Sequence, residues 1–150
     1  STAWLVLGIW TGAWFLFALV VAPTAFRVLP SSQAAGQLVG PVLASLHVYG
    51  LVAGLILAAL SLALRRGPWI IGLALVMAAL CGFSEFGVTS AIDAVRPTAF
   101  GPNANAAAAA EFSRLHETSR ALFGLVGLGL VILTVLQARA DSGKETPAPS

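Results

Sequence analysis

Residues 111–139 read EFSRLHETSRALFGLVGLGLVILTVLQAR. The first ten residues are polar and ionisable, and the next sixteen, Ala121 to Leu136, carry no charge. A helix that is apolar all round over this length does not suit the surface of a soluble domain. The stretch therefore predicts a helix that crosses a membrane and carries ionisable side chains at one interface.

The composition extends this conclusion to the whole chain. Of 150 residues, 58% are hydrophobic and 9% are charged, whereas soluble domains carry about 25% charged residues. The net charge of +2 and the lack of a basic run argue against nucleic acid as a partner. The single cysteine, Cys81, excludes an internal disulfide. The sequence predicts an all-α integral membrane protein.

Four membrane spans are predicted in one bundle domain, residues 1–139. They cover about residues 3–28, 38–64, 68–93 and 112–138. Pro23 is expected to kink the first helix, Gly40-Pro41 to bend the second, and the third to end before Pro97. Ser31 or Ser32 and Asn105 are the expected N-caps. Residues 94–111 form a loop and the start of the last helix, and residues 140–150 are expected to be a disordered tail.

Arginine placement predicts the orientation of the bundle. With four spans running up and down, both termini and the turn between the second and third helices share one side. That side holds Arg65, Arg66, Arg139 and Lys144, so it is predicted to be cytoplasmic and residues 94–111 extracytoplasmic. We expect a bacterial cytoplasmic (inner) membrane. The first segment lacks a basic n-region, so we expect a span and not a cleaved signal; Ser1 is what removal of an initiator methionine leaves.

Small residues are expected to hold the bundle together, because lipid provides no hydrophobic drive for helix association. Glycines recur at helical spacing in three of the four spans. The predicted packing glycines are Gly8, Gly12, Gly50, Gly54, Gly124 and Gly127. The four tryptophans, Trp4, Trp10, Trp14 and Trp69, are interpreted as interface anchors or lipid contacts. Together these features predict a compact up-down bundle.

Ionisable side chains gather at one predicted depth. His47 lies 18 residues before Arg65, and Glu85 lies 18 residues after Gly67, so each is roughly 27 Å along its helix at about 1.5 Å per residue. Arg120 reaches a similar level in the last helix. We expect Glu85 and Arg120 to pair across the bundle, because an unpaired charge at this depth is costly. The candidate polar site is His47, Glu85, Arg120, His116 and Ser119.

Two ligand types compete with ordinary packing at this site. Met77, Cys81 and Glu85 share a stripe at i, i+4 spacing, and thioether and thiolate suit Cu(I). A metal site would use Met77, Cys81, His47 and His116. A haem b would need His47 and His116 as axial ligands, but their depths differ by roughly 7 Å. No cofactor is expected, apart from bound lipids.

Several short motifs resemble those of one membrane protein family. They are Gly12-Ala-Trp14, Val21-Ala-Pro-Thr-Ala-Phe26, Leu29-Pro30 and Phe112-Ser-Arg-Leu-His116-Glu-Thr-Ser119. Together they resemble the transmembrane protein 205-like family, small membrane proteins with a domain of unknown function in bacteria, over about residues 3–135. The chain departs at Ala121-Leu-Phe123, where the family commonly has an asparagine after the serine. The resemblance implies a four-helix membrane fold and little chemistry, because the family has no established activity.

Three functional classes follow. The first is a non-enzymatic accessory or scaffold subunit that packs beside other membrane proteins, in a respiratory or photosynthetic complex for example, or self-associates. The second is a membrane metal-handling or transport protein that uses the polar site. The third is a b-type haem carrier. Enzyme classes with a phosphate loop, a dinucleotide glycine pattern, an HExxH motif or a Ser-His-Asp set are excluded by the sequence. We favour the first class.

Overall fold

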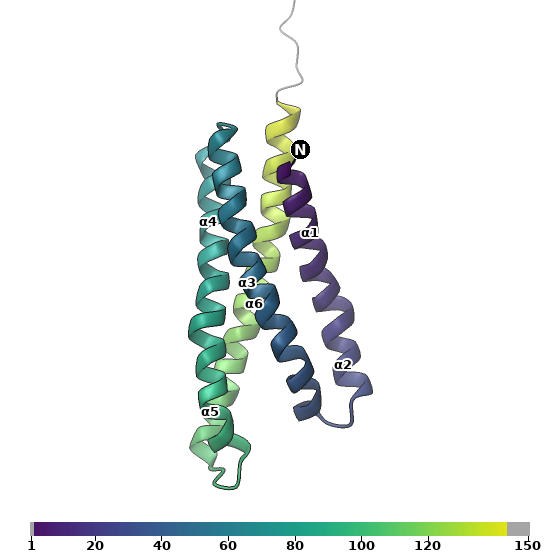
Figure 1. Ribbon diagram of the computed structural model, residues 1–150, viewed down its shortest axis with the longest axis vertical. Coiled ribbons are helices and arrows are strands. Elements are labelled where there is room, and N and C mark those ends of the chain that lie inside the picture. The colour runs from purple at the N-terminus through teal and green to yellow at the C-terminus, as the bar shows by residue number, and fades with distance from the viewer. Residues whose placement is uncertain (1, 144–150) are drawn as a thin grey trace, which may run out of the picture.

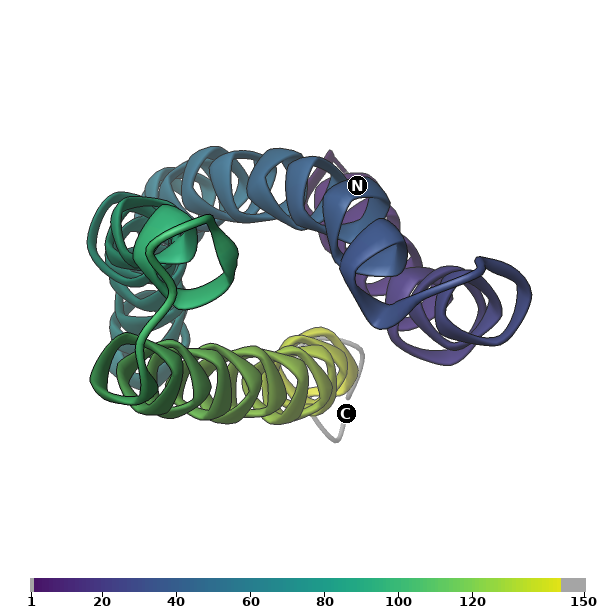
Figure 2. The same cartoon turned by 90° about the horizontal axis from the view of Figure 1, so that it is seen from below.

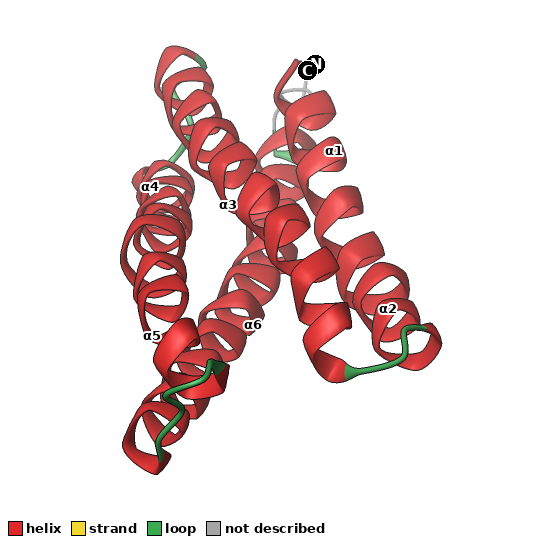
Figure 3. Ribbon diagram, turned by 60° about the horizontal axis from the view of Figure 1, so that its bottom comes forward, coloured by secondary structure: helices red, strands yellow, loops and turns green. Residues whose placement is uncertain are grey.

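The computed structural model describes residues 2–143 and confirms the four-helix membrane fold. Four helices in this range are long and apolar enough to cross a membrane. They run alternately up and down, and short loops join them (Figures 1 and 3). The N-terminus, the turn between the second and third helices and the last turn of the fourth lie at one end of the bundle, here called the terminal end (Figure 1). The opposite end, with residues 29–31 and 101–105, is called the loop end.

The first helix is continuous but changes its winding near Pro23. It consists of α1 (Thr2–Leu16), a π-helical segment η1 (Phe17–Val21) and α2 (Ala22–Val28). Proline has no N–H and cannot make the i→i−4 bond, so the preceding turn loosens. The predicted disturbance at Pro23 therefore takes the form of a π-segment before it.

The second helix, α3 (Ser32–Ala63), runs without interruption through Pro41. Ser31 caps it, as predicted: its Oγ accepts from the N–H of Ala34 at 3.1 Å. Residues 32–37, which precede the predicted span 38–64, belong to the same helix. Ser45 Oγ donates to the carbonyl of Pro41, one turn earlier, at 3.0 Å.

The helix α3 ends in a Schellman turn that aims Arg66 at the bundle. The N–H of Arg66 bonds the carbonyl of Ser61 at 2.8 Å, and that of Arg65 bonds the carbonyl of Leu62 at 3.0 Å. Arg65 takes the left-handed conformation at φ 50°. Because the turn places residue 66 on the inner side, its long side chain reaches the last helix.

Replacing Arg65 with glycine is expected to stabilise the protein. Its left-handed backbone costs a residue with a Cβ about 1 kcal/mol, and glycine removes that cost. Unfolding in mixed SDS micelles should show a gain of up to about 1 kcal/mol. Arg65→Ala, which removes the same side chain and keeps the Cβ, is the control. Equal stability of the two variants would contradict the prediction.

The third helix extends beyond its predicted end. It comprises α4 (Pro68–Phe83), a second π-segment η2 (Ser84–Thr89) and α5 (Ser90–Phe100). Pro97 lies inside α5, so the expected end before Pro97 is wrong. The helix continues because one missing N–H near the terminus costs one bond, and Thr98 then donates to the carbonyl of Val95 at 2.9 Å.

The fourth helix, α6 (Ala106–Ser142), is longer at both ends than the predicted span. Asn105 caps it as predicted, with its Oδ1 accepting from Ala108 at 2.9 Å. The expected disorder from residue 140 is wrong for Ala140–Ser142, which are helical. Residues 144–150, with Lys144, lie outside the described residues.

The core lies where all four helices meet, toward the terminal half. Its largest side chains, Trp10, Trp14, Leu57, Met77 and Leu130, are 1% exposed or less. Seen from below, α3, α4–α5 and α6 form three sides of the bundle, and α1–α2 stands at the fourth (Figure 2). Toward the loop end α2 and α6 diverge (Figures 1 and 2). The polar site of the next section lies on the loop-end side of the core.

Candidate functional site

His47 of α3 and Glu85 of η2 are hydrogen-bonded to each other inside the bundle. The distance from Nδ1 of His47 to Oε2 of Glu85 is 3.4 Å. The imidazole is 1% exposed and the Glu85 side chain 17%. The prediction that both residues lie at one height and face inward is confirmed. Glu85 sits in the π-turn Ser84–Thr89, a distortion that is frequent at functional sites.

Aromatic and sulfur side chains surround this pair. The Trp14 ring lies 6.0 Å from the His47 ring, centroid to centroid. One turn from His47, Gly50 brings α3 close to its neighbours: a Cβ there would lie 2.7 Å from Cys81 Sγ and 3.0 Å from Trp10 Nε1. Glycine is therefore required for α1 and α4 to approach α3 here. The approach packs both tryptophans beside the polar site.

Within residues 2–143, several buried polar atoms on the helical segments that form the site have no hydrogen-bond partner. They are Nε2 of His47, Nε1 of Trp10, Oγ of Ser84 and Oγ1 of Thr11. The imidazole nitrogen of His47 and the two hydroxyl oxygens can accept a hydrogen bond, whereas the indole N–H of Trp10 can only donate one. An unpartnered polar group in an apolar interior costs free energy. The site is therefore built to hold something that makes hydrogen bonds.

The other predicted site residues do not join this pair. Within the described range, the ion-pair partner of Glu85 is His47, so the expected Glu85–Arg120 pair is wrong. Arg120 and His116 lie on the exposed side of α6, and His116 stacks on Phe112 at 6.1 Å. Ser119 alone points inward, at 7% exposure. Arg120 and His116 are exposed and Ser119 is buried, so the rotation of α6 about its axis turns both ionisable side chains out of the bundle.

The alternative metal site would use Met77, Cys81, His47 and His116. Among residues 2–143, no three His, Cys, Asp or Glu side chains gather in a way that could hold a metal ion. Met77 packs instead against Gly129, where a Cβ would lie 2.8 Å from its sulfur. His116 is exposed, so it does not face His47 as a second haem ligand would.

The predicted packing glycines divide into two groups. Gly50, Gly54 and Gly127 lie at close helix contacts, and Gly129 is a fourth that the sequence analysis missed. Around Gly8, Gly12 and Gly124, no described atom lies within 4 Å of a built Cβ. Their predicted role inside the bundle is wrong, because they lie on its outer faces.

The tryptophans divide in the same way. Trp69 is 82% exposed, as expected for a lipid or interface contact. Trp10 and Trp14 are fully buried, so their interpretation as anchors is wrong. Trp14 stacks on Phe123 at 4.4 Å and donates to the Phe123 carbonyl at 3.2 Å. This contact holds α1 against α6 next to His47.

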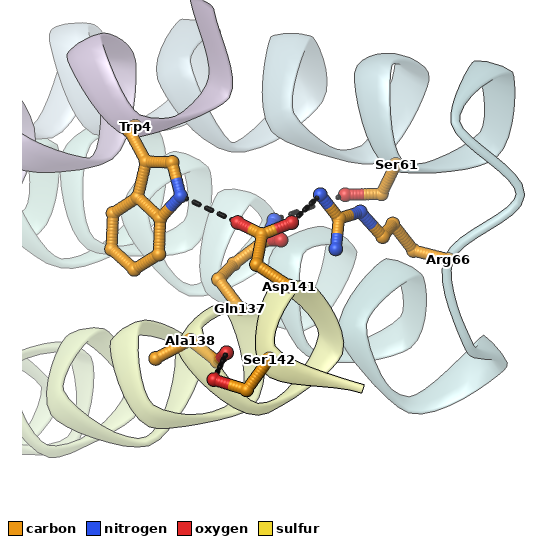
Figure 4. Close-up of polar contacts among 7 residues, drawn as sticks. All are labelled: Trp4, Ser61, Arg66, Gln137, Ala138, Asp141 and Ser142. Carbon is orange, nitrogen blue, oxygen red and sulfur yellow. Dashed lines mark hydrogen bonds and ion pairs between the residues drawn. The ribbon is translucent and has the colours of Figure 1, made fainter. Parts of the chain in front are cut away.

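A second polar cluster closes the terminal end (Figure 4). The Arg66 guanidinium pairs with Asp141, whose second oxygen accepts from Trp4 Nε1 at 2.7 Å. One turn deeper, Gln137 donates to Ser61 Oγ at 3.4 Å. The cluster joins α1, the α3–α4 turn and α6. We had placed Asp141 in the tail, although its charge opposite Arg65-Arg66 could have indicated this contact.

A comparison with protein families gives one match. The model of a family described as Domain of unknown function (DUF4149) matches residues 5–100. No curated protein and no solved structure matches the chain. The matched residues contain His47 and Glu85 but not the motif Phe112–Ser119, and nothing in the comparisons supports the transmembrane protein 205-like family in particular.

Proposed function

The chain belongs to this family of unknown function, and we propose that it is a non-enzymatic accessory or scaffold subunit of a membrane complex. Its partner is a transmembrane helix of another membrane protein. The terminal end faces the cytoplasm, and the membrane is the cytoplasmic (inner) membrane of a bacterium. The observation that carries the proposal is the outward glycine face of α1.

This glycine face consists of Gly8 and Gly12, spaced as in the GxxxG pattern. Both glycines are exposed, and no described atom approaches the position of a Cβ at either one. A GxxxG face lets the backbone of another helix approach closely, where van der Waals packing drives association. No helix of this bundle packs against the glycine face, so a helix of another chain can pack there.

An apolar groove lies beside the glycine face. It has a volume of about 330 Å³ and runs between α1–η1, with Phe15 and Ala18, and α6, with Gly124 and Leu128. Phe15 follows Gly12 by three residues and so lies on the same side of the helix. A partner helix against Gly8 and Gly12 can therefore place bulky apolar side chains in the groove. The shape of the groove supports a docking surface here, and charge plays no part in the argument.

The double variant Gly8→Leu/Gly12→Leu is expected to fold but to lose its partner. Open space at both positions accepts the side chains, whereas a docked helix would be pushed away by several ångströms, which removes most of its contacts. Purification from native membranes in mild detergent, with light scattering for mass, measures the result. We expect the wild type to run as a complex and the variant as a single chain.

Gly72→Leu is the matched control, because Gly72 is also exposed with no atom near a built Cβ, but lies on α4. It should keep the partner. A wild type that is monomeric under these conditions, or a complex that survives in the double variant, would contradict the proposal.

A further inference from the structure

The pair of His47 and Glu85 lacks a compensating charge. Within residues 2–143, each is the other's ion-pair partner. The neighbouring elements present Trp10 and Trp14 from α1 and Cys81 from α4, and none of these side chains is a cation. On α6, which also packs against η2, the ionisable residues His116 and Arg120 are exposed, and neither forms an ion pair with Glu85 among the described residues. With a neutral imidazole and an ionised carboxylate, the pair carries one negative charge among apolar helices. Such a charge is costly within a membrane.

One bound proton removes that charge. A proton that leaves a hydronium ion in the adjacent water can bind the pair, which then holds either an imidazolium and a carboxylate or an imidazole and a carboxylic acid. In both forms the net charge is zero, and the hydrogen bond between Nδ1 and Oε2 is kept. The step needs no other reactant.

Unpartnered atoms on the helical segments that pack at the pair can hold the water that accompanies this proton. His47 Nε2, Trp10 Nε1 and Ser84 Oγ come from three different helical segments and are all buried. A buried water typically makes about three hydrogen bonds to such groups. Water among these atoms would extend the hydrogen-bonded network beyond the pair.

Metal ions fit the same atoms less well. Zinc and related ions take about three or four protein ligands, and Ca²⁺ takes about six to eight oxygen atoms. No three His, Cys, Asp or Glu side chains in the described part of the chain, residues 2–143, gather in a way that could hold a metal ion. His47 and Glu85 are already hydrogen-bonded to each other, and the unpartnered oxygens on the neighbouring segments are the Ser84 and Thr11 hydroxyls. A proton needs no more than this pair.

The burial pattern gives the site access from one side. Glu85 is 17% exposed while His47 is 1% exposed, so the carboxylate is the more accessible member of the pair. Toward the terminal end, Leu7, Leu57, Met77 and Leu130 are each 1% exposed or less and close the bundle. We propose that His47 and Glu85 form an intramembrane proton-binding site, hydrated by Trp10 and Ser84 and reached from the loop end.

Infrared titration of the protein in lipid nanodiscs tests this site. The wild type should show a carboxylic-acid carbonyl band whose amplitude follows pH, and Glu85→Gln, which keeps the side-chain volume, should lose it. His47→Gln should keep the band but move its midpoint by about one pH unit, a tenfold change in proton affinity. Glu117→Gln, on the exposed side of α6, is the matched control and should leave the band unchanged.

If a variant fails to fold, a nuclear magnetic resonance measurement on the wild type still tests the proton-binding site. The chain has two histidines, so the ¹⁵N spectrum of histidine-labelled wild type has two sets of ring signals. One set should respond to pH together with the carbonyl band and show a hydrogen-bonded Nδ1. The proposal is overturned if the band survives in Glu85→Gln, if neither histidine responds with it, or if purified wild type retains one metal ion per chain that His47→Gln loses. These results do not depend on a partner, so the site and the proposed subunit role can fail separately.

Discussion

Gly54→Leu is expected to prevent the bundle from folding. A Cβ at residue 54 would lie 2.9 Å from the carbonyl oxygen of Ala74 and 2.9 Å from the Cβ of Ala78. Both neighbours belong to the α4 backbone or its first side-chain atom, so neither can rotate away. Even Gly54→Ala must separate α3 from α4, and overpacking of this kind costs about 1–3 kcal/mol. Leucine adds three more carbons and exceeds what these helices can accommodate.

Two other glycines provide graded controls for this prediction. Gly129→Ala meets the Met77 sulfur at 2.8 Å, but a methionine side chain is adaptable, so its cost should be smaller. Gly72→Ala meets nothing within 4 Å and should be neutral or slightly stabilising. Unfolding in mixed SDS micelles gives the order. Equal effects of all three alanines would show that α3 and α4 are not in close contact at Gly54.

Asp141→Leu is expected to cost about 2 kcal/mol of folding stability, because it leaves the buried Arg66 charge without this carboxylate. The cost is below that of a fully buried pair, since the Asp141 side chain is 39% exposed. The Arg66 side chain is 6% exposed, and its Nε and Nη1 already lack partners. The helix end near Asp141 should then loosen, since Trp4 also loses its acceptor. The measurement is unfolding free energy, with hydrogen exchange of the last turns of α6 as a local readout.

A double variant separates the buried charge from simple loss of contacts. Arg66→Leu/Asp141→Leu should recover most of the lost stability, because replacing a buried pair with apolar groups is often neutral. Trp4→Phe removes a hydrogen bond only and should cost about 1 kcal/mol. Arg65→Gln, at the exposed neighbour of Arg66, is the control and should have little effect. A double variant as unstable as Asp141→Leu would contradict this account.

The candidate site shows how far residue spacing could lead. Counting residues from the helix ends placed His47 and Glu85 at one depth, and the structure confirms it, because helical rise is a local property. The same counting placed Arg120 there too, and the pairing that we inferred from it is wrong. Depth depends on the position along one helix, whereas contact also depends on how each helix is rotated about its axis.

The sequence did not determine how each helix is rotated about its own axis. On the surface of a soluble protein, the polar face of a helix indicates that the opposite face is buried. These spans are apolar on all sides, because lipid and protein interior are equally apolar. Gly8 and Gly50 therefore look alike in sequence, although one faces outward and the other contacts Cys81. Trp10 and Trp69 were given the same interpretation for the same reason. The π-turn at Glu85 had no signal in the sequence.

The sequence by itself determined that this protein has four membrane-spanning helices, their order, and the caps at Ser31 and Asn105. These features depend on hydropathy, length and local hydrogen bonds, which neighbouring residues settle among themselves. Only the tertiary structure decided that Glu85 binds His47, that Asp141 binds Arg66, and which glycines face outward. These depend on side-chain packing between helices distant in sequence, which selects one rotation of each helix from several that lipid would accept equally.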